Sequence, residues 1–220
     1  MDLFGRILQI LVHALLIRPI VFVIFGLGIR DRHKLPTKGP AIVVANHNSH
    51  LDTGVMMSLF PLRYLHRVRP VGAAEYWVKS KGFVSWFVLT IMGIIPMDRG
   101  ARGRGEDPFV EVSKALSNGD ILIVYPEGSR GEPERMAELK KGISHLVEAH
   151  PDVPVTPVFL RGVGKALPRG SWLPVPLFVD VWVGDAIHWT GDRDSYMAEL
   201  RLAIANLARQ GRTAQWSEHE

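Results

Sequence analysis

Short runs of apolar residues alternate with longer amphipathic segments along most of this 220-residue chain. Continuous apolar runs bounded by turn residues are typical of strands buried on both faces of a sheet. Apolar residues at helical spacing between these runs indicate helices packed on the sheet. The predicted strands are residues 41–45, 67–73, 93–97, 121–125, 155–160 and 177–183, and the predicted helices are residues 51–60, 76–91, 107–119, 134–150 and 195–209. The alternation predicts an α/β fold, a single domain with a largely parallel central sheet flanked by helices.

The N-terminus departs from this alternation, because residues 7–28 form a dense apolar block with Arg18 and Pro19 near its middle. The block is long enough to span a membrane, which takes ~20 apolar residues. However, a charge at the bilayer centre costs ~2.5–3.5 kcal/mol and proline interrupts the helical hydrogen bonds. Two short helices, residues 3–17 and 19–28, would form a shallow hairpin in which Arg18 anchors the chain by reaching the lipid headgroups. A tilted single span, a signal peptide and a pair of buried core helices are the alternatives.

The chain is therefore divided into an N-terminal apolar helical membrane anchor, residues 1–34, and an α/β domain, residues 35–220. Basic residues at positions 30–34 adjoin the apolar block, which predicts an inner or plasma membrane location with the α/β domain on the cytoplasmic face. The net charge of +4 suits anionic lipids, phosphorylated substrates or nucleic acid alike. The absence of cysteine excludes disulfides, thiolate zinc sites and a cysteine nucleophile.

A cluster of polar residues at positions 46–52 (NHNSHLD) directly follows the predicted strand 41–45. Ligands of open α/β sheets bind at the carboxyl ends of the strands. A bend from loop to helix can bring the carboxylate of Asp52 onto one imidazole nitrogen of His47, so that the other nitrogen can take a proton. The alternative is an ordinary helix cap beside a solvated loop histidine, and His50 competes with His47 for either role.

Residues 125–131 (YPEGSRG) follow the predicted strand 121–125 in the same way. Gly128 allows the backbone to approach a ligand, and Arg130 offers a fork of donors suited to phosphate. A plain strand-to-helix turn is the alternative, since proline and glycine are ordinary turn residues.

Two further segments carry weaker signals. Residues 93–100 (GIIPMDRG) end near Arg99, which could bind an anion or simply pair with Asp98. Residues 153–158 (VPVTPV) place proline inside a predicted strand, which favours an edge strand or a wall against which another group packs.

The order of these four blocks, NHxxxxD (the HX4D motif), GxIPxxR, PEGxR and VPVxPV, resembles that of the glycerolipid acyltransferases typified by 1-acylglycerol-3-phosphate acyltransferase. The resemblance spans roughly residues 41–158, and the apolar N-terminus is in keeping with it. NHxxxxD alone occurs often by chance, whereas four blocks in this order, each at a strand end, are specific. Two departures, Tyr125 in place of a common phenylalanine and Ser129 in place of a common threonine, are expected not to touch the chemistry.

The resemblance implies an O-acyltransferase of phospholipid biosynthesis, which moves a fatty acyl group from acyl-CoA or acyl carrier protein to a lysophospholipid hydroxyl. The simplest acceptor is 1-acylglycerol-3-phosphate, which gives phosphatidic acid. The implied partners are membrane lipids, the acyl donor and the lysophospholipid acceptor, with no cofactor beyond the donor as co-substrate and no metal. The implied catalytic residues are His47 and Asp52, and the implied substrate-binding residues are Arg99, Glu127, Gly128 and Arg130.

Several alternatives stay open beside this interpretation. The acceptor could be another lysolipid, such as lyso-ornithine lipid, or the same dyad could serve a lipid thioesterase or hydrolase. His47, His50 and Asp52 could form a metal ligand set, although the resemblance argues against it. The basic loop at residues 99–105 (RGARGRG) has no interleaved aromatic residues and belongs to no recognisable binding module, so no nucleic-acid partner is expected.

Overall fold

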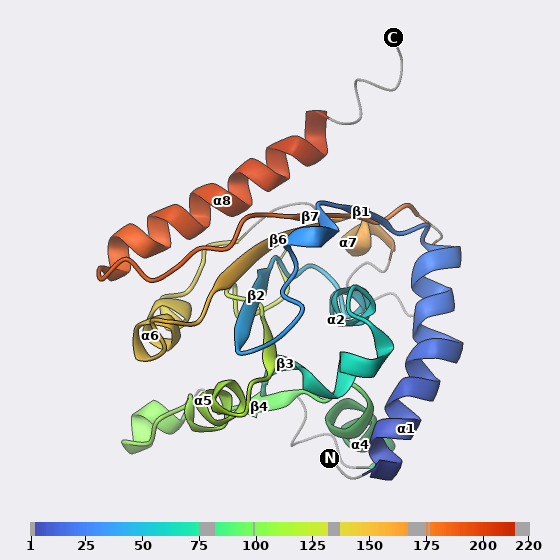
Figure 1. Ribbon diagram of the computed structural model, residues 1–220, viewed down its shortest axis with the longest axis horizontal. Helices are drawn as coiled ribbons and strands as arrows, with labels where there is room; N and C mark the ends of the chain where they lie inside the picture. The colour runs from blue at the N-terminus through green and yellow to red at the C-terminus, as the bar shows by residue number, and fades with distance from the viewer. Residues whose placement is uncertain are drawn as a thin grey trace.

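The computed structural model describes residues 3–74, 82–98, 100–131, 137–166, 175 and 177–213. Within them seven strands form one sheet in the order β1-β7-β6-β2-β5-β3-β4 (Figure 1). Strands β2 to β6 run parallel to one another, whereas β7 is antiparallel to β6 and parallel to β1. The strands are β1 (Gly28–Arg30), β2 (Ala41–Ala45), β3 (Val68–Ala73), β4 (Ile95–Met97), β5 (Ile121–Val124), β6 (Val155–Arg161) and β7 (Asp180–Val183). The predicted α/β fold with a largely parallel sheet is confirmed.

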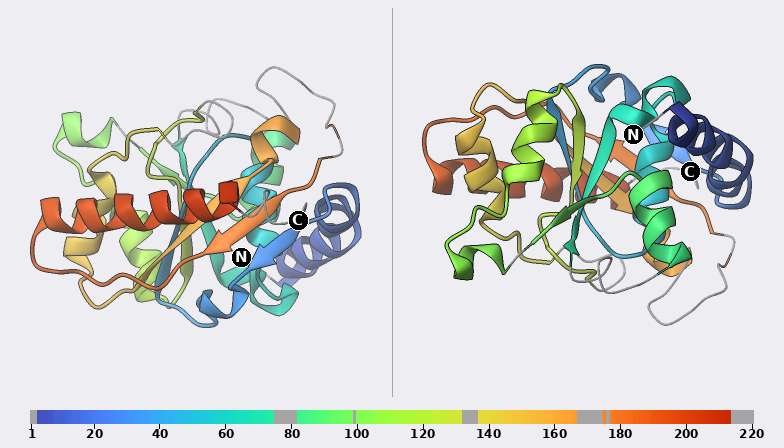
Figure 2. Two further views of the ribbon diagram at one scale, coloured as in Figure 1. Left: turned by 90° about the horizontal axis from the view of Figure 1, so that it is seen from above. Right: turned by 90° about the horizontal axis from the view of Figure 1, so that it is seen from below.

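Helices cover both faces of this sheet (Figures 1 and 2). One face carries α2 (Leu51–Ser58), α4 (Phe83–Trp86), η5 (Phe87–Ile91) and the N-terminal helix, and the other carries α5 (Val110–Ser117), α6 (Gly142–Ala149) and α8 (Arg193–Thr213). Short helical turns complete the described chain: η3 (Arg32–Lys34), η4 (Leu62–Arg67), η6 (Ala101–Arg104) and α7 (Val163–Ala166). In β2, Val43 packs into the core on one face and Ile42 and Val44 into the core on the other. A strand buried on both faces explains the continuous apolar run.

Several predicted boundaries differ from the structure. The helix predicted over residues 134–150 begins only at Gly142, because residues 137–141 are not helical, and residues 134–136 lie outside the described chain. The first part of the helix predicted over residues 76–91, up to residue 81, also lies outside it. Residues 28–30, assigned from sequence to the anchor, form β1 and pair with β7.

The apolar N-terminal block forms one continuous helix, Leu3–Ile24, rather than the predicted hairpin. It consists of α1 (Leu3–Val12) followed by two wider π-helical pieces, η1 (His13–Ile17) and η2 (Ile20–Ile24). Arg18 and Pro19 both keep helical backbone angles between these pieces, so the predicted break is wrong. Pro19 has no N–H to donate, but the helix continues through it because the turns on either side are wider than those of an α-helix.

The structure gives Arg18 contacts within the protein, and its predicted role as a headgroup anchor stays a prediction. Its guanidinium turns toward the domain and donates hydrogen bonds to the carbonyl oxygens of Phe60 and Ser58, at the C-terminal end of α2. Arg32 adds a third such bond, to the carbonyl oxygen of Leu59 (2.9 Å). The last carbonyls of a helix lack intrahelical donors and carry partial negative charge, so two arginines are favourable there.

The N-terminal helix is the reverse of an ordinary surface helix. Two of its polar side chains face the domain, whereas Arg6 is exposed. Gln9 is buried and donates to the carbonyl oxygen of Ile91 (3.0 Å), and His13 is buried beside it. Most of its exposed side chains are large and apolar, and η5, against which it packs, and the adjoining α4 add more. We call this surface the apolar face; it comprises Leu3, Phe4, Ile7, Leu11, Leu15, Leu16, Phe22, Val23, Ile24, Phe83, Val84, Trp86 and Leu89. Among the described helices, Leu3–Ile24 is the one whose length and composition would suffice to cross a membrane.

Replacing Arg18 with methionine is expected to destabilise the domain without weakening its attachment to membranes. The substitution removes hydrogen bonds from a charged donor, each worth about 1.5–3 kcal/mol. The variant should therefore unfold at a lower temperature in detergent. The control is Arg30→Met, which changes an exposed arginine and should leave the unfolding temperature unchanged. Lost membrane retention with unchanged unfolding would support the headgroup role instead.

Candidate active site

Asn46 ends β2 and ties this end of the strand to β6. Its side-chain amide donates to the carbonyl oxygen of Leu160 (2.9 Å), and its side-chain oxygen accepts the Leu160 N–H (2.7 Å). Both bonds are buried, so they fix the point at which His47 leaves the sheet. Nothing in the sequence pattern predicts this role of Asn46, because its partner lies 114 residues away. The one feature of the sequence that could have indicated this role is the position of Asn46 directly after an apolar run.

The carboxylate of Asp52 organises the loop that follows. Its Oδ2 lies 2.8 Å from Nδ1 of His47 and also accepts the backbone N–H groups of Asn48 (2.6 Å) and Ser49 (2.8 Å). Asp52 is fully buried in the first turn of α2. A carboxylate in this role only accepts, so Nδ1 of His47 carries a proton and Nε2 is the acceptor nitrogen of the neutral ring. The predicted contact of His47 with Asp52 is confirmed, whereas His50 is exposed.

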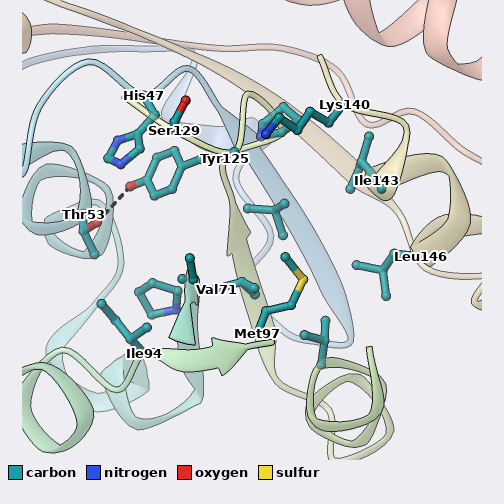
Figure 3. Close-up of a pocket in the computed structure, with 18 of the residues that line it drawn as sticks. His47, Thr53, Val71, Ile94, Met97, Tyr125, Ser129, Lys140, Ile143 and Leu146 are labelled. Atoms are coloured by element: carbon teal, nitrogen blue, oxygen red, sulfur yellow. Dashed lines mark hydrogen bonds between the residues drawn. The ribbon is translucent and has the colours of Figure 1, made fainter. Parts of the chain in front are cut away.

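Tyr125 packs against the face of the His47 imidazole. The two rings stack with centroids 4.2 Å apart and planes 19° apart, and the Tyr125 hydroxyl donates to Oγ1 of Thr53 (3.3 Å), as Figure 3 shows. Burial raises the pKa of Tyr125 well above its usual value, and the nearby Asp52 carboxylate adds to the effect. The ring of Tyr125 therefore packs directly on His47, whereas the hydroxyl by which it departs from phenylalanine bonds to Thr53, so the expectation that this departure does not affect the chemistry stays a prediction.

Glu127 joins the two polar loops. Its Oε1 accepts the backbone N–H of His47 (3.0 Å), its Oε2 accepts the N–H of Ala137 (3.3 Å), and the Gly131 N–H donates to the His47 carbonyl oxygen (2.9 Å). Burial raises the pKa of Glu127, and the two N–H donors oppose that rise. Both carboxylate oxygens are thus engaged by backbone, so Glu127 shapes the loops around His47.

The cation next to this loop is Arg130, which is half-buried and lines the same pocket as His47. Burial and then the positive charge of Arg130 lower the pKa of His50 nearby. Gly128 has a positive φ of 72°, a conformation that favours glycine. The predicted partner of Arg130, Arg99, lies outside the described residues.

A pocket of about 310 Å³ opens at His47 and extends along the carboxyl ends of β3, β4 and β5 toward α5 and α6 (Figure 3). Figure 3 shows the polar residues His47, Ser129 and Lys140 at one end of the pocket, and Arg130, next to Ser129 in the chain, lines it as well. The remainder is largely apolar, with walls formed by Val71, Ile94, Met97, Phe109, Val112, Ile143 and Leu146. Such a pocket can hold an alkyl chain with one end beside the imidazole.

The fourth sequence block forms the first part of β6, and it is not an edge strand as its prolines suggested. β6 lies between β2 and β7. Pro157 pairs with Val44, and its carbonyl oxygen accepts the N–H of Gly184 (2.8 Å), so the strand lacks one donor and keeps the acceptor. Pro157 is not among the residues that line the pocket.

Comparison with known proteins points to one family. The acyltransferase family model matches residues 27–161. Human 1-acyl-sn-glycerol-3-phosphate acyltransferase alpha is 32% identical over 60% of this chain and 44% of its own length. The chloroplastic enzyme LPAT1 of Arabidopsis thaliana, 1-acyl-sn-glycerol-3-phosphate acyltransferase by name, is 27% identical over 69% of the chain and 40% of its own length. The chain thus spans less than half of these relatives.

The fold has a counterpart among solved structures. The crystal structure of the 1-acyl-sn-glycerophosphate acyltransferase PlsC of Thermotoga maritima superposes with a TM-score of 0.73, over 94% of this chain and 81% of that one. The sequence identity is 18%, so this likeness establishes the fold.

Proposed function

The chain belongs to the acyltransferase family, and we propose that it transfers a fatty acyl group from a thioester to the free hydroxyl of a lysophospholipid. The preferred acceptor is 1-acylglycerol-3-phosphate and the product phosphatidic acid, as the names of its relatives suggest. The observation that carries the proposal is His47, bound to buried Asp52 at the mouth of an apolar pocket.

In the proposed reaction Nε2 of His47 removes the proton from the acceptor hydroxyl. The oxygen attacks the thioester carbonyl, the tetrahedral intermediate collapses, and the C–S bond breaks. The imidazolium returns its proton to the leaving thiolate, so no acyl-enzyme forms and no cofactor takes part. Asp52 keeps the imidazole in one tautomer and stabilises its charged form. General-base help of this kind accelerates a reaction about 10²–10⁴-fold.

Binding of the two substrates divides between the two ends of the pocket. Arg130 holds the acceptor phosphate, Gly128 has no side chain to keep the ligand from the backbone, and Arg99 is proposed as a further phosphate ligand. Glu127 supports this loop through its backbone bonds rather than by touching phosphate. The acyl chain of the donor, acyl-CoA or acyl carrier protein, occupies the apolar end of the pocket.

The apolar face is proposed to enter one leaflet of the membrane, with the α/β domain on the cytoplasmic side of an inner or plasma membrane. Gln9 and Arg18 bond the N-terminal helix to the domain, so a helix spanning the bilayer would have to give up both contacts. Lying along the domain, the helix keeps the hydrogen bonds of Gln9 and Arg18 and presents apolar side chains to lipid.

Replacing Leu15 and Val23 together with serine is expected to reduce flotation of the protein with phospholipid vesicles. Both side chains are more than two-thirds exposed, at 75% and 79%, so the fold should tolerate the change. Leu202→Ser is the matched control, because this exposed leucine lies on α8, across the sheet. Equal flotation of the double variant and the wild-type protein would exclude the apolar face as the membrane contact.

The acceptor assignment is tested by measuring thiol release from acyl-CoA with a panel of acceptors. Release should depend on acceptor and be fastest with 1-acylglycerol-3-phosphate. A faster reaction with lyso-ornithine lipid or another lysolipid would replace the acceptor, and release independent of any acceptor would indicate a thioesterase.

A further inference from the structure

A second cation lies at the polar end of the pocket, outside the four sequence blocks. Lys140 belongs to the segment between the 125–131 loop and α6, and it lines the same pocket as His47 and Arg130. Figure 3 shows its side chain reaching back toward Ser129 and Tyr125. This placement brings a lysine ammonium to the region in which the acceptor phosphate is proposed to bind.

The backbone around Lys140 is held in place by the loop it covers. Its N–H donates to the carbonyl oxygen of Pro126 (2.9 Å), and the nearby Ala137 N–H donates to Glu127 (3.3 Å). The preceding residue, Leu139, is buried in the core. The backbone of Lys140 is therefore held in place, although its side chain is exposed.

Gly128 shows how closely the ammonium approaches the loop. A Cβ atom at this position would lie 3.0 Å from both Cδ and Nζ of Lys140. The lysine side chain thus passes directly over the glycine, two residues from Arg130. A larger residue at position 128 would push the ammonium away.

The charges around the pocket would allow a second cation to bind the acceptor phosphate. The described residues that line it include Arg130 and Lys140 but no Asp or Glu. The carboxylates of Asp52 and Glu127 are engaged by His47 and by backbone N–H groups. A phosphate monoester carries about 1.5–2 negative charges near neutral pH, because its second pKa is about 6, whereas a phosphodiester carries one.

We infer that Lys140 is a second phosphate-binding residue, which with Arg130 selects an acceptor bearing a terminal phosphate monoester over lysolipids bearing a phosphodiester. The inference rests on the proposed function and adds a determinant of acceptor choice to it. Arg130 supplies a planar fork for two oxygens, and Lys140 supplies a point charge for the extra negative charge of the monoester.

The test compares Lys140→Met with the neighbouring Lys141→Met. The Lys141 side chain is 77% exposed, and its Nζ lies 4.0 Å from Oδ1 of Asp194. Lys141 is not among the residues that line the pocket. Initial rates are measured with 1-acylglycerol-3-phosphate and with lysophosphatidylglycerol, each at saturating acyl-CoA. The KM for acyl-CoA is measured at saturating acceptor.

Lys140→Met should raise the KM for the monoester acceptor about tenfold or more, since a charge-assisted hydrogen bond contributes ~1.5–3 kcal/mol and 1.4 kcal/mol is tenfold. The kcat, the KM for acyl-CoA and the KM for the phosphodiester acceptor should change little. Lys140→Arg should restore most of the preference, and Lys141→Met should match the wild-type protein.

Three results would overturn the inference while leaving the proposed function intact: an unchanged preference between the two acceptors, an equal loss with both, or a raised KM for acyl-CoA, which would assign Lys140 to the donor phosphates. A wild-type protein that acylates neither lysolipid would overturn both.

Discussion

Replacing His47 with alanine should lower kcat for acyl transfer about 10²–10⁴-fold, the contribution typical of a general base. The imidazole is the group placed between buried Asp52 and the pocket, so its loss removes the proton acceptor. Thermal unfolding should change little, because His47 is a half-buried loop residue whose backbone bonds to Glu127 and Gly131 survive the substitution. Rates are measured as thiol release and as acylated product.

His50→Ala is the matched control for this substitution. His50 lies in the same loop and lines the same pocket, but Asp52 accepts from His47 instead. The control should therefore lose far less activity. Near-normal turnover in His47→Ala, or a larger loss in His50→Ala, would end the proposed mechanism.

Asp52 should show two separable losses when it is replaced in two ways. Asparagine keeps an oxygen for the three donors that meet at Oδ2 but removes the negative charge, so transfer should fall, by up to about 10⁴-fold, with a small change in stability. Alanine leaves the buried N–H groups of Asn48 and Ser49 without that acceptor, and each such loss costs about 1–3 kcal/mol.

The two measurements for Asp52 are kcat and thermal unfolding of the same preparations. Asp52→Ala should lose both activity and stability, and Asp52→Asn mainly activity. Wild-type kcat in Asp52→Asn would show that the charge of Asp52 contributes nothing to the reaction, and that Asp52 serves only to fold the loop.

A strand buried on both faces gives the clearest signal in the sequence. β2 was located to the residue, because a parallel strand covered by helices on both sides must be apolar throughout. β1 was missed because it has only three residues, none of them buried, at the edge of the sheet and adjoins an apolar block that resembles an anchor. Its partner β7 lies about 150 residues further along the chain, as the pairing of Gly28 with Asp180 shows.

The proposed dyad was predictable because its two members lie five residues apart and a single bend brings them together. Asn46, Tyr125 and Lys140 were not, since each acts on a partner from another strand or loop. The N-terminal helix was misjudged for the same reason. A charge and a proline in an apolar block predict a break in the helix. The carbonyl oxygen that accepts a hydrogen bond from Arg18 belongs to a residue far along the chain, so the sequence does not reveal it.

The most direct test is to follow the acyl group itself. Purified protein in detergent is mixed with radiolabelled acyl-CoA and 1-acylglycerol-3-phosphate, and the label is located by chromatography over a single turnover. The label should pass from CoA to phosphatidic acid with one thiol released per product, no labelled protein, and no transfer in His47→Ala. Label recovered as free fatty acid, or thiol release that proceeds equally without the acceptor, would contradict the assignment.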